Sequence, residues 1–138
     1  MAVVLGYDES PGAEAALDAA IQVAQRYGEE LVLVYGAAPP GGMGEEFKSH
    51  LDALLDMGRT ATAHAVEKVE AAGVTASVRL VDAKPAEALV QVGNELDATV
   101  IVVGTNGESP LRGAIIGSTP HKLLHLTNRP VLCVPFAR

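Results

Sequence analysis

Ala98-Thr99-Val100-Ile101-Val102-Val103-Gly104-Thr105-Asn106-Gly107 joins a short run of mostly β-branched residues directly to a turn that contains two glycines. A run without polar alternation predicts a strand that is buried on both faces, as in the middle of a parallel sheet. Nine residues, 108–116, separate Gly107 from Gly117-Ser118-Thr119, where the pattern changes to that of a helix from about Thr119 to Thr127. The segment therefore predicts a strand, a glycine-rich loop and a helix in succession.

Outward from this segment, short apolar runs alternate with longer stretches of helical period along the whole chain. Gly28 and Gly73 are predicted stop signals of the first two helices, and Ser10 is a predicted N-cap, with Asp8 as the alternative cap. Such alternation predicts an α/β protein, a three-layer sandwich with a five-stranded parallel sheet in one domain, residues 1–138. We expect strands at 2–7, 31–35, 74–81, 98–103 and 131–134, and helices at about 11–27, 46–72, 85–96 and 119–127.

Ligands of open parallel sheets bind beyond the carboxyl ends of the strands, which here means the connections 7–11, 36–44, 82–85 and 104–118. The last of these is the most informative. Glycines beside a strand end allow close approach of the backbone to a ligand, although Gly104 and Gly107 are also compatible with ordinary turns. A Gly-Ser-Thr tripeptide that opens a helix offers free amides and hydroxyls to phosphate oxygens. This loop therefore predicts a phosphate-bearing ligand.

Neither the Gly-Lys-Ser/Thr of a P-loop nor the Gly-x-Gly-x-x-Gly of a dinucleotide site occurs in the sequence. The spacing G-x2-G-x9-G-[S/T], which ends a fourth strand and precedes a final helix and the strand Pro130–Val134, resembles the nucleotide loop of ATP-binding universal stress proteins. An opening strand followed by Asp8, Ser10 and Pro11 is also typical of that family. The resemblance covers nearly the whole chain, and it implies an adenine nucleotide alpha hydrolase-like (Rossmann-like) fold.

The resemblance also implies a role for each matching residue. Asp8 would lie beside the ribose or beside a Mg²⁺ ion that accompanies the phosphates, and Gly6 and the backbone near Gly36 would face the adenine. Similar proteins are commonly homodimers joined along the last strand, here residues 131–135. The ribose and phosphates would be lined by Val103, Gly104, Thr105, Asn106 and Gly107, and Gly117, Ser118 and Thr119 would hold the phosphates. Apart from the resemblance, Arg112 in the same loop is a candidate counter-charge, with a solvated loop cation as the alternative.

The implied function is that of a stress-response regulator that binds ATP and hydrolyses it slowly at most. No catalytic lysine, nucleophile–base pair or multi-carboxylate metal site can be recognised. Pro120 stands where relatives often carry a further hydroxyl residue, and its missing amide would favour AMP or cyclic AMP instead. A nucleotide-free dimeric module of the same family is a further alternative.

A phospho-receiver domain is an alternative from another class. Asp8-Glu9 after the first strand, Asp82 after the third and Thr105 after the fourth suggest it. That mechanism needs a Lys-Pro pair after the fifth strand, however, and Lys84-Pro85 follows the third.

The formal net charge is −7 and the isoelectric point is near 5.0, which argues against nucleic-acid and anionic-membrane surfaces. With no basic leader and no apolar run of membrane length, a cytoplasmic location is expected. The single cysteine, Cys133, predicts a buried thiol. His121 and His125 share one face of a predicted helix, but without a third ligand nearby in sequence their spacing alone does not predict a metal centre.

Overall fold

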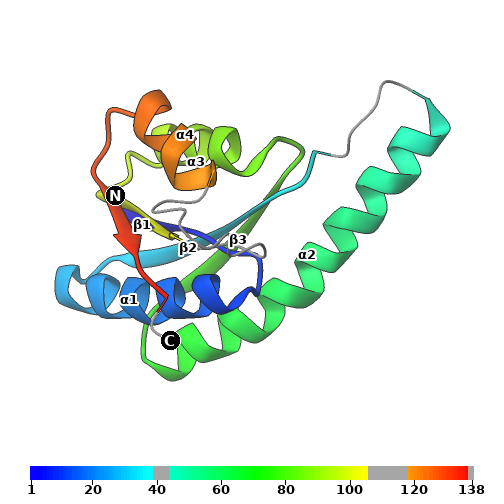
Figure 1. The fold of residues 1–138 in the computed structure, drawn as a ribbon. Helices are drawn as coiled ribbons and strands as arrows, with labels where there is room; N and C mark the ends of the chain where they lie inside the picture. The colour runs from blue at the N-terminus through cyan, green and yellow to red at the C-terminus, as the bar shows by residue number, and fades with distance from the viewer. Residues whose placement is uncertain (39–43, 106–117, 137–138) are drawn as a thin grey trace.

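The computed structural model describes residues 1–38, 44–105 and 118–136. Strands and helices alternate along this part of the chain, as the apolar pattern predicts (Figure 1). The predicted ends differ from the observed ones by two residues at most. The strands are β1 (Ala2–Gly6), β2 (Glu30–Gly36), β3 (Ala76–Val81), β4 (Val100–Gly104) and β5 (Val131–Val134), and the helices are α1 (Pro11–Tyr27), α2 (Glu45–Ala71), α3 (Pro85–Glu95) and α4 (Ser118–Leu126).

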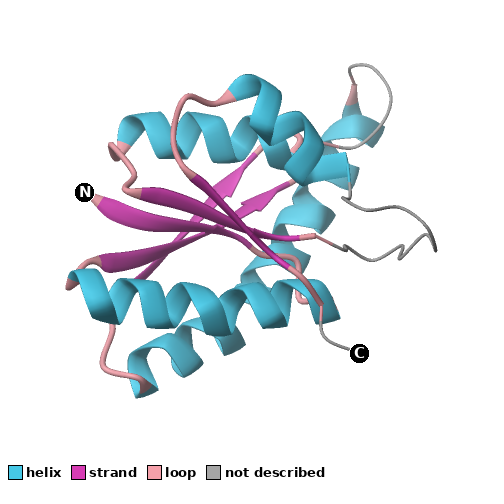
Figure 2. Cartoon of the chain, turned by 60° about the vertical axis from the view of Figure 1, so that its left-hand side comes forward, coloured by secondary structure: helices cyan, strands magenta, loops and turns pink. Residues whose placement is uncertain are grey.

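All five strands are parallel, and their order in the sheet is β3-β2-β1-β4-β5. The sheet lies between two layers of helices, so the predicted three-layer sandwich is confirmed (Figure 2). The order reverses between β1 and β4, because the chain builds outward to β3 before it returns to the other side of β1. Receiver domains have the order 2-1-3-4-5. The phospho-receiver alternative is therefore wrong.

Two apolar clusters hold the layers together, one on each face of the sheet. On one face α1 and α2 cover the sheet, with Leu17 and Val69 fully buried. On the other face α3 and α4 supply Leu89 and Leu123, which are also fully buried. Burial of each such leucine contributes about 2 kcal/mol. Because β1 contributes to both clusters, its residues are apolar without alternation.

The ends of α1 follow from its sequence. Ser10 caps the helix, because its Oγ accepts a hydrogen bond from the amide of Ala13 at 3.2 Å. Gly28 ends it with a φ of 66°, a left-handed conformation that glycine adopts without strain. Both predictions are confirmed. The alternative of Asp8 as the cap is wrong, because its Oδ1 accepts from the amide of Ser10 at 3.0 Å instead.

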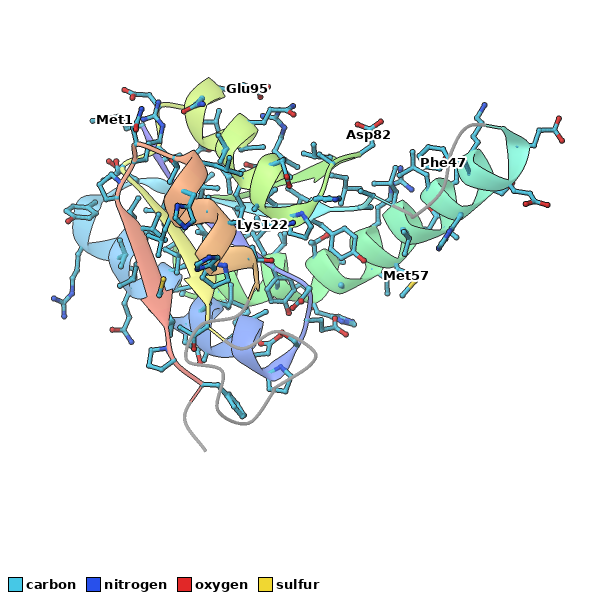
Figure 3. All side chains as sticks on the ribbon, turned by 45° about the horizontal axis from the view of Figure 1, so that its top comes forward. Met1, Phe47, Met57, Asp82, Glu95 and Lys122 are labelled. Carbon is cyan, nitrogen blue, oxygen red and sulfur yellow. The ribbon has the colours of Figure 1, made fainter. Side chains whose placement is uncertain are left out.

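Only the second half of α2 is buried against the sheet, through Gly58, Thr62, Ala65 and Val69. The first half projects beyond the sheet and carries Phe47 near its far end (Figures 1 and 3). None of the described helices is both long and apolar enough to cross a lipid bilayer.

Candidate functional site

The two central strands part at their carboxyl ends. β1 pairs with β4 only as far as Leu5. Beyond this point the amide of Tyr7 donates to the carbonyl of Val34 on β2 at 3.0 Å, and the amide of Thr105 donates to the carbonyl of Val134 on β5, also at 3.0 Å. Each central strand has thus turned to its outer neighbour. This is the switch point of the sheet, where open α/β sheets bind their ligands.

Asp8 follows β1 directly at this switch point. The amide of Ser10 donates to its Oδ1 at 3.0 Å, and the intervening Glu9 has a φ of 65°. A left-handed conformation is uncommon for a residue with a Cβ, so the chain turns sharply here. The turn leaves Asp8 exposed, with one carboxylate oxygen oriented by the backbone and the other without a donor among the described residues.

Tyr7 ties the end of β1 to α1. Its side chain is buried, and its hydroxyl donates to the carboxylate of Glu14 in the first turn of the helix. Burial raises the pKa of Tyr7 well above its usual value, and the hydrogen bond to Glu14 raises it further. The phenol therefore stays neutral and remains a donor. It fixes the segment that carries Asp8.

Two glycines predicted at the site, Gly104 and Gly36, are also required by the packing around it. A Cβ on Gly104 would lie 2.6 Å from the carbonyl oxygen of Gly12, and one on Gly36 would lie 2.8 Å from that of Ala83. A Cβ on Gly6 would meet side-chain methyl groups rather than backbone, those of Leu89 at 3.0 Å and of Val103 at 3.4 Å, so Gly6 is less restricted. The chain's own close contacts therefore explain Gly104 and Gly36 without a ligand, and the contacts of all three glycines with a nucleotide stay predictions.

The structure describes some of the remaining predicted residues. The side chain of Val103 is buried and lies near Gly6, whereas Thr105 and Thr119 are half-buried. α4 begins at Ser118, so the predicted helix start after the glycine-rich loop is confirmed. The predictions for Asn106, Gly107, Arg112, Gly117 and the side chain of Ser118 lie outside the described part of the chain.

Carboxylates outnumber cations at this end of the sheet. The described residues of the four connections include the carboxylates Asp8, Glu9 and Asp82 but only one cationic side chain, Lys84. Figure 3 shows Asp82 beyond the end of β3. The described side chains of these connections therefore supply little positive charge to a phosphate group, whereas backbone amides can bind phosphate without net charge.

A groove of about 730 Å³ lies beside Asp8, between the start of α1, the end of β2 and α2. Sequence reasoning missed its far wall, because α2 comes close only in the folded chain. One signal was present: Gly58 sits inside a helical pattern, where glycine usually has a packing reason. A Cβ at Gly58 would lie 2.5 Å from the ring of Tyr35. The groove is lined by Asp8, Glu9, Ser10, Pro11, Tyr35, Asp56, Met57, Thr60 and Ala61.

The described part of the chain contains no preformed metal centre of protein side chains. Within residues 1–38, 44–105 and 118–136, three or more His, Cys, Asp or Glu side chains never come together in a geometry that could hold a metal ion. Cys133 on β5 is half-buried rather than buried as expected, and its partial burial raises the pKa of the thiol. A Mg²⁺ ion at Asp8 would therefore need oxygen ligands from a bound nucleotide and from water.

The sheet order, the parting of β1 and β4, and a helix that starts with serine after β4 define an α/β protein of the Rossmann-like class, with its ligand end at the switch point. The model of the universal stress protein family matches residues 1–135. The chain belongs to the universal stress protein family.

Individual relatives agree with this assignment. A universal stress protein of Thermus aquaticus is 31% identical over 134 residues, which cover 96% of each chain. A universal stress protein solved in complex with cAMP is 26% identical, with a TM-score of 0.76, and the match covers 99% of this chain and 98% of that one. The fold is also shared with the universal stress protein of Archaeoglobus fulgidus solved in complex with dAMP, at 23% identity, a TM-score of 0.72 and 97% coverage of both chains.

Proposed function

We propose that this protein is a regulator that binds an adenine nucleotide, ATP in the first instance, at the carboxyl ends of β1 and β4. The observation that carries the proposal is the oriented, exposed carboxylate of Asp8 at the point where these two strands part. The similar protein solved with cAMP supports an adenine nucleotide as the ligand. The glycine-rich loop and the start of α4 would then supply amides to the phosphates.

Asp8 also fits a Mg²⁺ ion bound together with the nucleotide. The ion prefers oxygen ligands and usually binds through one or two carboxylates plus phosphate oxygens. When bound, it would neutralise phosphate charge in a region where Asp8, Glu9 and Asp82 otherwise repel it. The amide of Ser10 orients the carboxylate, and the Tyr7–Glu14 hydrogen bond holds the strand end in place. We expect hydrolysis to be slow at most, because no catalytic lysine, nucleophile–base pair or multi-carboxylate metal site can be recognised in the sequence.

Pro120 favours a second candidate, a preference for AMP or cyclic AMP. It is the third residue of α4 and is buried, and proline has no amide hydrogen. The first turn of α4 therefore presents one donor fewer to a phosphate chain. A ligand with a single phosphate loses less by this than a triphosphate does.

We further propose a homodimer formed through residues 131–135. β5 is one of the two edge strands of the sheet, and Leu132 and Phe136 are 37% and 39% exposed. An apolar edge strand invites pairing with another chain unless something covers it. A nucleotide-free dimeric module would keep this edge and lack the ligand. Light scattering tests the dimer: Leu132→Lys should give a monomer if the edge is the interface, and an unchanged mass would contradict it.

Identification of the nucleotide released from the denatured protein is the first test. Calorimetric titration of the native protein with ATP, AMP and cyclic AMP, with and without Mg²⁺, follows. Asp8→Asn should weaken Mg-ATP binding about tenfold or more, because it removes the negative charge of the carboxylate beside the ion. Gly117→Val should abolish ATP binding if the loop holds the phosphates.

Asp52→Asn is the matched control, because Asp52 is exposed on the projecting half of α2. It should bind like the parent protein. If none of the three nucleotides binds the parent protein, the nucleotide proposal fails and the dimeric module remains. If AMP or cyclic AMP binds more tightly than ATP, Pro120 becomes the discriminating residue.

A further inference from the structure

Two histidines lie side by side on the outer face of α4. The ring centroids of His121 and His125 are 4.9 Å apart, and the ring planes are inclined by 75°. Both side chains are exposed. The intervening Leu123 is fully buried in the core, so the helix that carries the rings is anchored to the sheet. Figure 3 labels Lys122, which follows His121 in this helix.

We propose that His121 and His125 together form a surface site for a divalent transition-metal ion of the Cu²⁺ or Ni²⁺ type. Neutral imidazole is a good ligand for these ions, and the Irving–Williams order makes copper the tighter of the two. Residues four apart face one another across one helical turn. The two nitrogens that bind one ion have to come within about 3 Å of each other, given metal–nitrogen bonds of about 2 Å. The ring centroids are now 4.9 Å apart. Because both side chains are exposed, they can rotate until one nitrogen of each ring reaches the same ion.

The number of ligands decides which metals fit. A structural zinc site needs four protein ligands in a closed tetrahedron. The described residues offer no third metal-ligating group beside the two rings. Cu²⁺ and Ni²⁺ can take a planar or tetragonal set of nitrogen and oxygen ligands, so water can fill the remaining positions. The sequence spacing alone did not indicate this site. The close approach of two exposed rings on an anchored helix supplies the additional evidence.

The other two histidines provide internal controls. His50 and His64 are exposed on α2, and neither has a histidine one helical turn away. His64 lies 3.9 Å from a carboxylate oxygen of Glu9. If any exposed histidine were enough, all four would contribute to binding. If the pair is the site, only His121 and His125 will.

Calorimetric titration of the full chain with Ni²⁺ tests the site, because Ni²⁺ does not oxidise the thiol of Cys133. Two ligands tethered on one helix gain about 100-fold or more over one alone. His121→Ala and His125→Ala should therefore each lose about that factor in affinity. His50→Ala, His64→Ala and Cys133→Ser should bind like the parent protein. Circular dichroism should show the same helix content in all five variants.

A register variant keeps the number of imidazoles and removes their spacing. The double variant His125→Ala, Leu126→His places the second ring five residues from His121, off the shared face. It should bind Ni²⁺ as weakly as His125→Ala does. Electron paramagnetic resonance of the parent protein with Cu²⁺ should show coupling to two nitrogens, and to one nitrogen in His125→Ala. Equal Ni²⁺ affinity of the parent protein and either single variant, or loss of binding in Cys133→Ser, would overturn the proposal.

Discussion

At the amino end of the sheet the side chains close the structure, whereas at the carboxyl end they leave it open. Arg129, before β5, donates to Oδ1 of Asn94 at 3.2 Å and to Oδ1 of Asp97 at 2.8 Å, and so joins the chain ahead of β5 to the end of α3. Thr99, before β4, donates from Oγ1 to Oε1 of Glu29 at 2.7 Å. At the other end, Asp8 is exposed where β1 and β4 part. One end therefore contributes stability, and the other leaves the carboxylate of Asp8 exposed at the proposed ligand site.

Gly104→Ala should have the largest effect, because it tests whether the open end also has packing limits. The new Cβ would lie 2.6 Å from the carbonyl oxygen of Gly12. This contact is with backbone of α1, and neither α1 nor β4 can shift without disturbing the core. We expect a loss of about 3 kcal/mol in the free energy of unfolding, measured by urea denaturation. Gly6→Ala is the control on the neighbouring strand. Its Cβ meets side-chain methyl groups of Leu89 and Val103 and no backbone, so it should lose about 1 kcal/mol or less. Equal losses would show that the contact with Gly12 is not the cause.

Arg129→Ala tests the closed end. The side chain of Arg129 is only 23% exposed, and it also donates to the carbonyl of Ala98 at 3.3 Å. Its removal should cost about 1–2 kcal/mol in the free energy of unfolding, since hydrogen bonds to a charged group exceed neutral ones but Asp97 is solvated. Nucleotide affinity should stay unchanged, because this residue lies at the opposite end of the sheet. An altered affinity for ATP would mean that the two ends are coupled, and the contrast between them would fail.

Much of the fold could be predicted because it depends on local patterns. The uninterrupted apolar character of β1 and β4 predicts strands in the middle of the sheet, and Ser10 and Gly28 mark the ends of α1. The strand order could not be predicted, because it depends on pairings between residues far apart in sequence. Leu31, for example, pairs with Ala76.

The candidate site was predictable only in its near half. Asp8 and the start of α4 follow strand ends, so the rule for open sheets locates them. The wall formed by Met57 and Thr60 comes from the middle of α2, and only the packing of that helix on the sheet brings it beside Asp8. The sequence predicts that Gly104 allows a ligand to approach the backbone, and the structure shows that the close contact with Gly12 also requires a glycine there.

Ser10→Ala removes the N-cap of α1 at the carboxyl end of the sheet. The hydroxyl oxygen of Ser10 accepts from the amide of Ala13, and this amide would be left without an intrahelical partner. We expect a loss of about 1 kcal/mol in the free energy of unfolding. The amide of Ser10 still donates to Asp8, so Mg-ATP affinity should change less than in Asp8→Asn. If affinity falls as far as in Asp8→Asn, the cap and the ligand site act as one unit.

The smallest expected effect is the contribution of Asp97, at the amino end of the sheet, to the loss of stability in acid. The hydrogen bond from Arg129 holds the pKa of Asp97 below its usual value, and its charge lowers that pKa further. A carboxyl group whose pKa is lower in the folded than in the unfolded state stabilises the fold above its unfolded pKa. That stabilisation is lost as the pH falls through the folded pKa, which here means below about pH 4.

The urea concentration at which half of the parent protein is unfolded should therefore decrease as the pH is lowered from 6 to 3. Part of this decrease comes from protonation of Asp97. Arg129→Ala should remove this part, because the pKa of Asp97 then returns toward its unfolded value. Glu95 is the internal reference: the hydrogen bond from Arg79 lowers its pKa independently of Arg129, so its share of the acid dependence should persist. An identical pH dependence in Arg129→Ala and the parent protein would show that the Arg129–Asp97 pair does not contribute to closing the amino end.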